Sequence, residues 1–244
     1  MWKLNVRGVV AATLTVLILF LGTGESRTGE TTCDVALVLA DDVSGSMDDV
    51  EYDLLRGGYA SAFRDVEVIE TITGGGYGCI WVVVTQWRAY DQAAEAISWM
   101  RISNAVESKQ FATVVAEMPR LFDHGMASIA NTCTGCGLRL GIELLEHMPF
   151  VAVRRVLDMS GDGDGDDVAD TRVARDIAIA RRITINGLIV GPSQYYYEQY
   201  VVGGPGSFLL STGDYQGFAE SIKRKLILEI AGRTPDTPFQ LAYK

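Results

Sequence analysis

The sequence is poor in basic residues, and this scarcity excludes one large class of function. Its 244 residues include 21 Lys and Arg against 31 Asp and Glu, which gives a formal net charge of −10. An acidic surface repels phosphate backbones and anionic lipids, so no nucleic-acid partner is expected. The chain also lacks internal repeats and low-complexity tracts, and its length and 48% hydrophobic content suit one well-buried domain.

A long hydrophobic run is missing too. The N-terminal apolar run, residues 9–21, has 13 residues, whereas a membrane-spanning helix needs about 20. Lys3 and Arg7 precede this run and small residues follow it, which is the arrangement of a secretory signal peptide. We expect a signal peptide at residues 1–24, a linker at 25–32, and a periplasmic or secreted protein that is not inserted in the membrane after cleavage. An inner-membrane anchor formed by an uncleaved N-terminal helix is the alternative.

Cysteine is scarce as well, but the four residues present are an even number, which fits pairing in an oxidising compartment. Cys33 comes just before the first predicted strand and Cys79 just before the second. If those strands are parallel neighbours, both cysteines lie at the same sheet edge, where a disulfide is geometrically reasonable.

Segments typical of strands and helices alternate along the chain. Apolar, β-branched runs predict strands at residues 34–40, 80–86, 154–159, 183–190 and 207–211, with a weaker one at 93–101. Capping residues and apolar stripes predict helices from Asp48 or Asp49 onward and at residues 104–118, 135–148, 170–182, 194–201 and 215–231. The short connection between the second and third strands predicts an antiparallel hairpin. The fold class is therefore α/β: a doubly wound, mostly parallel six-stranded sheet with one antiparallel hairpin strand and helices on both faces.

Three polar segments are predicted to meet at one edge of this sheet. Asp42, Ser44 and Ser46 follow the first strand, Thr132 lies in the loop before the helix at 135–148, and Asp162 follows a later strand. Ligands of doubly wound sheets bind at the carboxyl ends of the strands. Alternate residues of an extended turn point the same way, so its three oxygens can face one ion together. Oxygen ligands favour Mg²⁺ or Mn²⁺, with Ca²⁺ less favoured. A helix-capping turn is the alternative for the first segment.

This pattern, Asp-x-Ser-x-Ser, then a distant Thr, then Asp-Gly, resembles the metal-ion-dependent adhesion site of von Willebrand factor A domains. The stretches LVLADDVSGSMDDVEY, RRVLDMSGDGDG, ITINGLIV, GGPGSF and IKRKLILEIAG also resemble an exported bacterial group of such domains of unknown function. The resemblance covers residues 33–232, and we expect a flexible tail at 233–244. It implies direct metal ligation by Ser44, Ser46 and Thr132, with Asp42 and Asp162 acting largely through water or changing with the ligand state.

Two positions depart from the resembled pattern. Asp41 stands where an apolar residue is usual, and its side chain should point away from Asp42. Cys136 stands where a polar or acidic residue is more frequent. Neither departure removes a ligand, but both bear on the affinity and choice of metal.

The acidic loop after residue 162 is a candidate for a second, weaker Ca²⁺ site. Asp164 and Asp166, together with Asp41, are the candidate ligands. An EF-hand does not match, because the residues at loop positions 6 and 12 are not Gly and Glu. A loop that caps the following helix is the favoured interpretation.

Cys133 and Cys136 form a Cys-x-x-Cys motif directly after Thr132. We favour a local disulfide that stiffens the predicted metal loop. A redox switch is the second interpretation, because the motif lies at a helix start. A zinc site is the least favoured, since only His124 and His147 could complete it.

Aromatic residues are few, at 9%, and two groups of them bear on function. Trp87 and Tyr90 lie at the hairpin on the predicted metal edge, where they would either contact a partner or pack over the sheet. The run Tyr195-Tyr196-Tyr197 precedes the last strand, so we expect it at the opposite edge as packing residues.

The expected function is binding rather than catalysis. An ion held by few ionised ligands keeps positive charge and an open position, which a carboxylate from a protein partner would fill. The segments that carry the predicted ligands contain no His or Lys to act as a general base, and no nucleophile signature is present, so an enzyme is not expected. A metal-dependent hydrolase with Asp41 or Asp164 as base, and a domain with a purely structural site, are the alternatives.

Overall fold

The structure is a computed structural model, and residues 32–122 and 132–235 are described. Residues 1–31 and 236–244 lie outside these ranges, and so do the predicted signal peptide, most of the predicted linker and most of the predicted tail. His124 also lies outside them. Within the described ranges, no helix is long and apolar enough to span a membrane.

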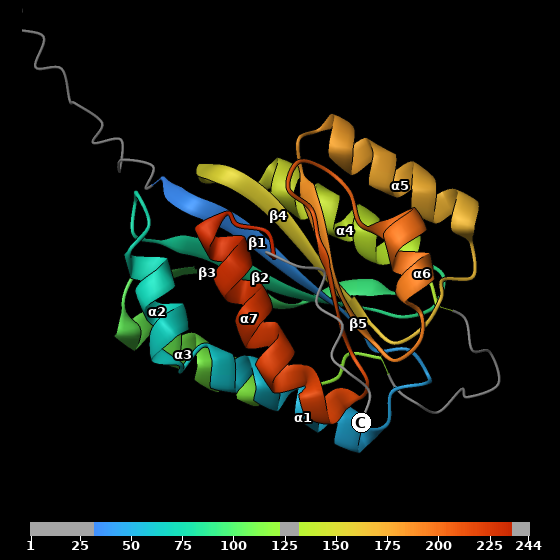
Figure 1. Cartoon of the computed structure of the whole chain (residues 1–244), viewed down its shortest axis with the longest axis horizontal. Helices are drawn as coiled ribbons and strands as arrows, with labels where there is room; N and C mark the ends of the chain where they lie inside the picture. The colour runs from blue at the N-terminus through green and yellow to red at the C-terminus, as the bar shows by residue number, and fades with distance from the viewer. Residues whose placement is uncertain (1–31, 123–131, 236–244) are drawn as a thin grey trace, which may run out of the picture. The chain divides into compact units, whose positions relative to one another are not determined.

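A six-stranded sheet forms the centre of the domain (Figure 1). Its order is β3-β2-β1-β4-β5-β6, and only the β2–β3 pair is antiparallel. The strands are β1 (Cys33–Asp42), β2 (Ile80–Trp87), β3 (Ala93–Ile102), β4 (Ala152–Gly161), β5 (Thr184–Val190) and β6 (Leu209–Thr212). This architecture confirms the predicted fold class.

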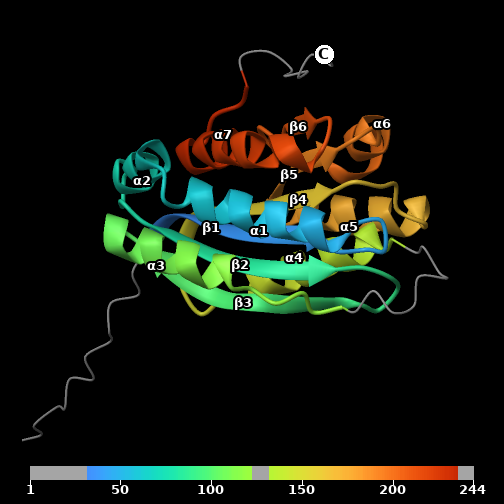
Figure 2. The ribbon, with the colours of Figure 1, turned by 90° about the horizontal axis from the view of Figure 1, so that it is seen from below.

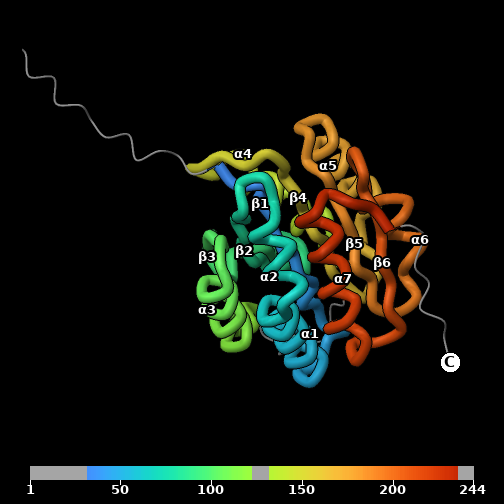
Figure 3. The backbone as a smooth tube through the Cα atoms, turned by 60° about the vertical axis from the view of Figure 1, so that its left-hand side comes forward, coloured from blue at the N-terminus to red at the C-terminus, as the bar shows by residue number. Residues whose placement is uncertain are grey.

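Helices cover both faces of the sheet (Figure 2). One face carries α1 (Asp49–Ala62), α2 (Val66–Thr73), α3 (Ala105–Ala116) and α7 (Phe218–Ala231). Figure 3 shows α1 between α3 and α7. The other face carries α4 (Thr134–His147), α5 (Val168–Ala180) and the short α6 (Gln194–Tyr196), which continues into a π-helical turn at Tyr197–Val201. A 3-10 turn at Tyr215–Gly217 leads into α7. The eight-residue helix α2 was absent from the sequence prediction.

Two hydrophobic cores explain why residues 35–40 of β1 form a continuous apolar run. Val35, Leu37 and Leu39 pack under α1 and α7, whereas Ala36 and Val38 pack on the opposite face. The side chains on both faces of this central strand therefore meet helices, and a strand covered on both faces is mostly apolar. The polar residues that follow at the carboxyl end of β1 are consequently held by a rigid strand.

A disulfide joins the starts of β1 and β2. Cys33 and Cys79 are bonded, with their Cα atoms 4.9 Å apart. The strands run parallel with Val35 opposite Ile80, so both cysteines lie at the amino-terminal edge of the sheet. This edge is opposite to the one that carries the predicted metal ligands.

Candidate metal centre

The candidate site lies where β1 and β4 end side by side. Asp42 is the last residue of β1 and Asp162 directly follows the last residue of β4. The two strands pair in parallel with Asp41 opposite Ser160, so both carboxylates reach the same edge. A side chain at Gly161 would meet Asp42 Cβ at 3.1 Å, so the absence of one lets the two segments approach closely.

Hydrogen bonds connect four of the predicted ligands into one cluster. The Ser44 backbone N–H donates to Asp42 Oδ1 at 2.8 Å. Ser44 Oγ and Ser46 Oγ are 3.2 Å apart, and the Ser46 hydroxyl donates to Asp162 Oδ1 at 2.9 Å. The turn after β1 therefore directs its oxygens toward the loop after β4, as alternate positions of an extended turn can.

The helix after this turn is capped by other residues. Asp48 and Glu51 form a capping box at the start of α1, with the Glu51 N–H donating to Asp48 Oδ1 at 2.8 Å. The capping preference of Asp and Ser thus does not account for Asp42, Ser44 and Ser46. The alternative interpretation of that segment as a helix cap is wrong.

Thr132 is held against the loop that begins with Asp162. The Thr132 N–H donates to Asp166 Oδ2 at 2.5 Å, and the Asp166 N–H donates to the carbonyl oxygen of Thr132 at 3.0 Å. The next residue, Cys133, donates its N–H to the Arg88 carbonyl at 2.6 Å. In the same loop Asp167 caps α5, accepting from the Asp170 N–H. The acidic loop therefore caps a helix, as favoured from the sequence, and also fixes the Thr132 segment.

Asp42 is buried and Asp162 is half-buried, and the charges of these two carboxylates are not fully compensated. Burial, and after it the nearby charge of Asp162, raise the pKa of Asp42 to about 8. Burial also raises the pKa of Asp162. Arg120 opposes both shifts without cancelling them. Asp42 Oδ2 is buried and has no hydrogen-bond partner, which is costly for a carboxylate in a low-dielectric site.

The donor set fits a hard divalent cation. Hydroxyl and carboxylate oxygens are the ligands that Mg²⁺ and Mn²⁺ prefer, and an ion would satisfy the unpartnered oxygen of Asp42. No three His, Cys, Asp or Glu side chains gather as a metal-binding group among the residues described, so the carboxylates alone do not make a site. The serine and threonine hydroxyls would have to supply the remaining ligands.

Residues 32–234 match the family described as "Protein of unknown function (DUF1194)". The chain belongs to this family. No curated protein matches it.

Solved structures show that this DUF1194 chain has a von Willebrand A-type fold. It is similar to "von Willebrand factor type A from Catenulispora acidiphila" at 14% identity and a TM-score of 0.58, over 82% of this chain and 43% of that one. It is also similar to proximal thread matrix protein 1 from the mussel byssus, in a structure "with zinc occupied MIDAS motif", at 14% identity and a TM-score of 0.57, over 82% of this chain and 47% of that one. The chain thus spans less than half of either protein. A third match is the vWF domain of the pili tip protein Mfa5 from Porphyromonas gingivalis, at 10% identity and a TM-score of 0.52, over 85% and 99% of the two chains.

The structure gives the three candidate ligands of the second metal site different surroundings. Asp41 is buried on the α1 face, where the Tyr59 hydroxyl donates to its Oδ1 at 2.7 Å. Asp166 instead binds Thr132, and Asp164 is exposed. Successive strand residues point to opposite faces, which is why Asp41 leaves the edge cluster while its neighbour joins it.

Two interpretations were open for Trp87, and the one in which it contacts a partner is wrong. The residue is 0% exposed and packs on α4 at Gly137, where an added Cβ would meet the indole at 2.6 Å. Packing over the sheet, the other interpretation, is the correct one. Tyr90, in the same hairpin, is 73% exposed and stays a candidate contact.

The tyrosine run was placed at the wrong edge. Tyr197 is fully buried, its hydroxyl lies against Gly161, and burial followed by the charge of Asp42 raises its pKa. Tyr196 lies within hydrogen-bond distance of Thr171, at 3.0 Å. These residues follow soon after the carboxyl end of β5. Their place at the sheet edge that carries the candidate site could therefore be predicted from the strand that precedes them.

Arg120 was not singled out from the sequence, yet it lies beside the site. Its Nη2 donates to the Met47 carbonyl at 2.7 Å, and its guanidinium stands 5.2 Å from the centre of the Tyr52 ring. It therefore fixes the end of the turn that carries the serines.

Cys133 and Cys136 are joined by a disulfide at the start of α4. Their sulfurs are thus not available as zinc ligands, and His147 Nδ1 lies 3.0 Å from the Glu143 carbonyl. The zinc interpretation is wrong in this oxidised state, and the favoured local disulfide is present.

Proposed function

We propose that the chain is an exported binding domain that holds a divalent cation and uses it to engage an acidic side chain of a protein partner. The proposed ligands are Asp42, Ser44, Ser46, Thr132 and Asp162, and the proposed ion is Mg²⁺ or Mn²⁺. The observation that carries this proposal is the buried, unpartnered oxygen of Asp42, which belongs to a cluster of hydroxyls and a second carboxylate.

The ion would supply positive charge at an exposed edge. Ser44 and Asp42 are buried, whereas Ser46 is exposed, so the cluster is closed toward the sheet and open toward solvent. Neutral hydroxyl ligands leave most of the ionic charge uncompensated. A partner carboxylate in the open position would complete the coordination.

Binding is favoured over catalysis by the residues available. The segments that form the cluster supply hydroxyls, carboxylates and nearby tyrosines, and they contain no His or Lys. A hydrolase would need a positioned base beside a metal-bound water. Asp41 is one base considered from the sequence. Its carboxylate accepts a hydrogen bond from Tyr59 in the core and does not join the hydrogen-bonded cluster.

Export is supported by the cysteines. All four form disulfides, Cys33 with Cys79 and Cys133 with Cys136, as expected in an oxidising compartment. We propose that residues 1–24 are removed as a signal peptide and that residues 33–232 act as the mature domain. The periplasm or the cell exterior is the proposed location.

The test is capture of a partner from envelope extract by the immobilised chain, with and without EDTA. We expect specific bands that disappear with EDTA, return with Mg²⁺ or Mn²⁺, and are absent for Asp42→Ala. Asp164→Ala is the matched control, because Asp164 is an exposed carboxylate of the acidic loop that is not a proposed ligand. Bands that persist unchanged in EDTA would refute the mechanism.

A further inference from the structure

The two disulfides of the chain differ in accessibility. Cys33 and Cys79 are separated by 46 residues and are both 0% exposed. Cys133 and Cys136 are separated by 3 residues, and Cys133 is only half-buried while Cys136 is 6% exposed. A disulfide closing a short loop restricts the unfolded chain less, and an accessible sulfur can be attacked by an external thiol. The second disulfide is therefore the one suited to exchange.

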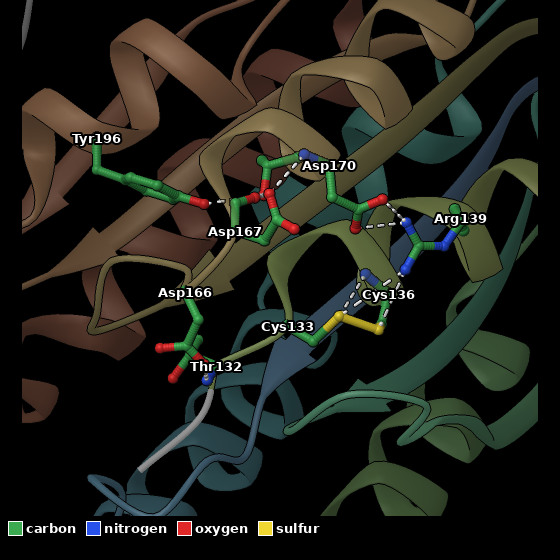
Figure 4. The surroundings of a disulfide bond; sticks show 9 residues. Thr132, Cys133, Cys136, Arg139, Asp166, Asp167, Asp170 and Tyr196 are labelled. Carbon is green, nitrogen blue, oxygen red and sulfur yellow. Dashed lines mark hydrogen bonds and ion pairs between the residues drawn. A yellow bond between two sulfur atoms is a disulfide. The ribbon is translucent and has the colours of Figure 1, made fainter.

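The positively charged guanidinium of Arg139 lies beside this second disulfide (Figure 4). Arg139 Nη2 is 3.3 Å from Cys136 Sγ and 3.9 Å from Cys133 Sγ. Arg139 Nη1 pairs with both carboxylate oxygens of Asp170, at 2.5 and 2.6 Å. Gly135 permits this pairing, because a side chain there would collide with the Asp170 carboxylate. The guanidinium is thus anchored from α5 while it faces the sulfurs at the start of α4.

We propose that the Cys133–Cys136 disulfide is an exchange site for an external dithiol, attacked at Cys133 and released at Cys136. A dithiol thiolate forms a bond to Cys133 Sγ, and the Cys133–Cys136 bond breaks with its electron pair leaving on Cys136 Sγ beside Arg139. The second sulfur of the dithiol then attacks the first dithiol sulfur, which is bonded to Cys133 Sγ in the mixed disulfide, and Cys133 leaves as a thiolate. Two electrons reduce the chain's disulfide to two thiols, the dithiol becomes a disulfide, and its two protons end on the two cysteines.

The same disulfide is connected to the metal loop. Cys133 directly follows Thr132, and its N–H donates to the Arg88 carbonyl. The Cys136 N–H donates to Cys133 Sγ at 3.2 Å, so the sulfur also caps the first turn of α4. Reduction removes the covalent closure of this turn and loosens the segment that carries the threonine. This consequence, unlike the exchange itself, rests on the proposed metal site.

The exchange is tested on the oxidised full chain with graded dithiothreitol. Samples are quenched, alkylated and digested, and mass spectrometry reports the free thiol at each cysteine over time. We expect Cys133 and Cys136 to open at least about tenfold faster than Cys33 and Cys79, because of their access and leaving group. Equal rates, or earlier opening of the buried pair, overturn the proposal.

The role of Arg139 is tested by Arg139→Met, with Arg139→Lys to keep a charge. We expect the first variant to slow opening by about tenfold and the second to restore part of the rate. Arg181→Met is the matched control: Arg181, the residue directly after α5, pairs with Glu146 of α4, and its side chain is 44% exposed, against 43% for Arg139. If Arg139→Met and Arg181→Met react alike, Arg139 does not assist the leaving sulfur.

Mg²⁺ and Mn²⁺ titrations of the oxidised chain and of the chain selectively reduced at Cys133 and Cys136 test the link to the metal loop. We expect the reduced form to bind the ion about fivefold more weakly, as loss of local order in one ligand segment predicts. Equal affinity in both forms overturns the link. Binding in neither form refutes the proposed function, whereas the exchange rates, which need no metal, still decide the redox site.

Discussion

At the scale of single residues, Asp42 is a position in the candidate site where charge and burial conflict. It lies at the end of a fully buried strand, its pKa is raised to about 8, and one of its oxygens has no hydrogen-bond partner. A buried carboxylate is tolerated when something nearby satisfies it. The serine hydroxyls and Asp162 cannot do so alone, because Asp162 carries the same charge.

A first prediction concerns the pH dependence of metal affinity. A cation binds the deprotonated form of Asp42, and the raised pKa means that protons compete with it below about pH 8. Affinity for Mg²⁺ should therefore rise from about pH 6 to about pH 8, by up to tenfold per pH unit. Calorimetric titrations across this range measure it. In Asp42→Asn the affinity should be lower and the slope flatter, and a wild-type affinity independent of pH contradicts the account.

A second prediction contrasts the two aromatic residues of the hairpin. Trp87→Ala should destabilise the fold by about 3–5 kcal/mol, because it empties a fully buried site against α4. Tyr90→Ala should change stability by less than about 0.5 kcal/mol, because that side chain is 73% exposed. Urea unfolding measures both. In the capture assay Tyr90→Ala should weaken the partner band, and undiminished capture removes Tyr90 from the binding surface.

The sequence predicts the surroundings of some single residues and not those of others. The clustering of Asp42, Ser44, Ser46 and Asp162 could be predicted because their spacing and order along the chain carry the pattern. The burial of Trp87 could not, because it depends on Gly137 in a helix 50 positions later in the chain. Local sequence indicates that an aromatic residue lies at a sheet edge, but the element packed over it decides exposure.

At the scale of elements, the site depends on how loops are joined to one another. The loop before α4 and the loop after β4 are paired through Thr132 and Asp166. The carboxyl ends of β1 and β4 were predictable as neighbours from the strand–helix alternation. The Asp166 contact was not, since carboxylates in an acidic loop suggest cation ligands and helix caps equally well from sequence.

A third prediction follows for Asp166→Ala. Loss of its bond to the Thr132 N–H should lower metal affinity by roughly 1 kcal/mol, which is about fivefold, with little change in stability. Asp164→Ala in the same loop is the control and should leave affinity unchanged. Parallel calorimetry and thermal unfolding of both variants measure the effect. If both variants bind as the wild type does, Thr132 is not positioned by this contact.

The tyrosine run shows why an element can be recognised and yet be misplaced. A short helix around residues 194–201 was predicted, and α6 with its π-helical turn occupies that range. The predicted sheet edge of this helix was wrong because it was inferred from β6, the strand that follows, and not from β5, the strand that precedes. The helix packs back beside β5, which brings Tyr197 against Gly161.

At the scale of the whole molecule, the two disulfides and the acidic composition are consistent with an exported domain of one α/β sheet. The fold class could be predicted in full, because alternating strands and helices restrict the topology strongly. The partner could not, because partner recognition depends on the shape and chemistry of an exposed edge rather than on the buried pattern.

A fourth prediction concerns location. Expressed from its own start in a bacterial host, the chain should be recovered from the periplasmic fraction with an N-terminus close to residue 25 and all four cysteines oxidised. Fractionation and intact-mass measurement determine this. Recovery of the uncleaved chain in the membrane pellet would instead support the N-terminal anchor.

The central claim is that Asp42, the two serines, Thr132 and Asp162 hold a divalent cation. Its most direct test is calorimetric titration of Mg²⁺ and Mn²⁺ into the EDTA-stripped chain near pH 8, beside Asp42→Ala and Asp164→Ala. The account predicts one saturable site in the wild type and in Asp164→Ala, and none in Asp42→Ala. No binding by the folded wild type, or equal binding by Asp42→Ala, would contradict it.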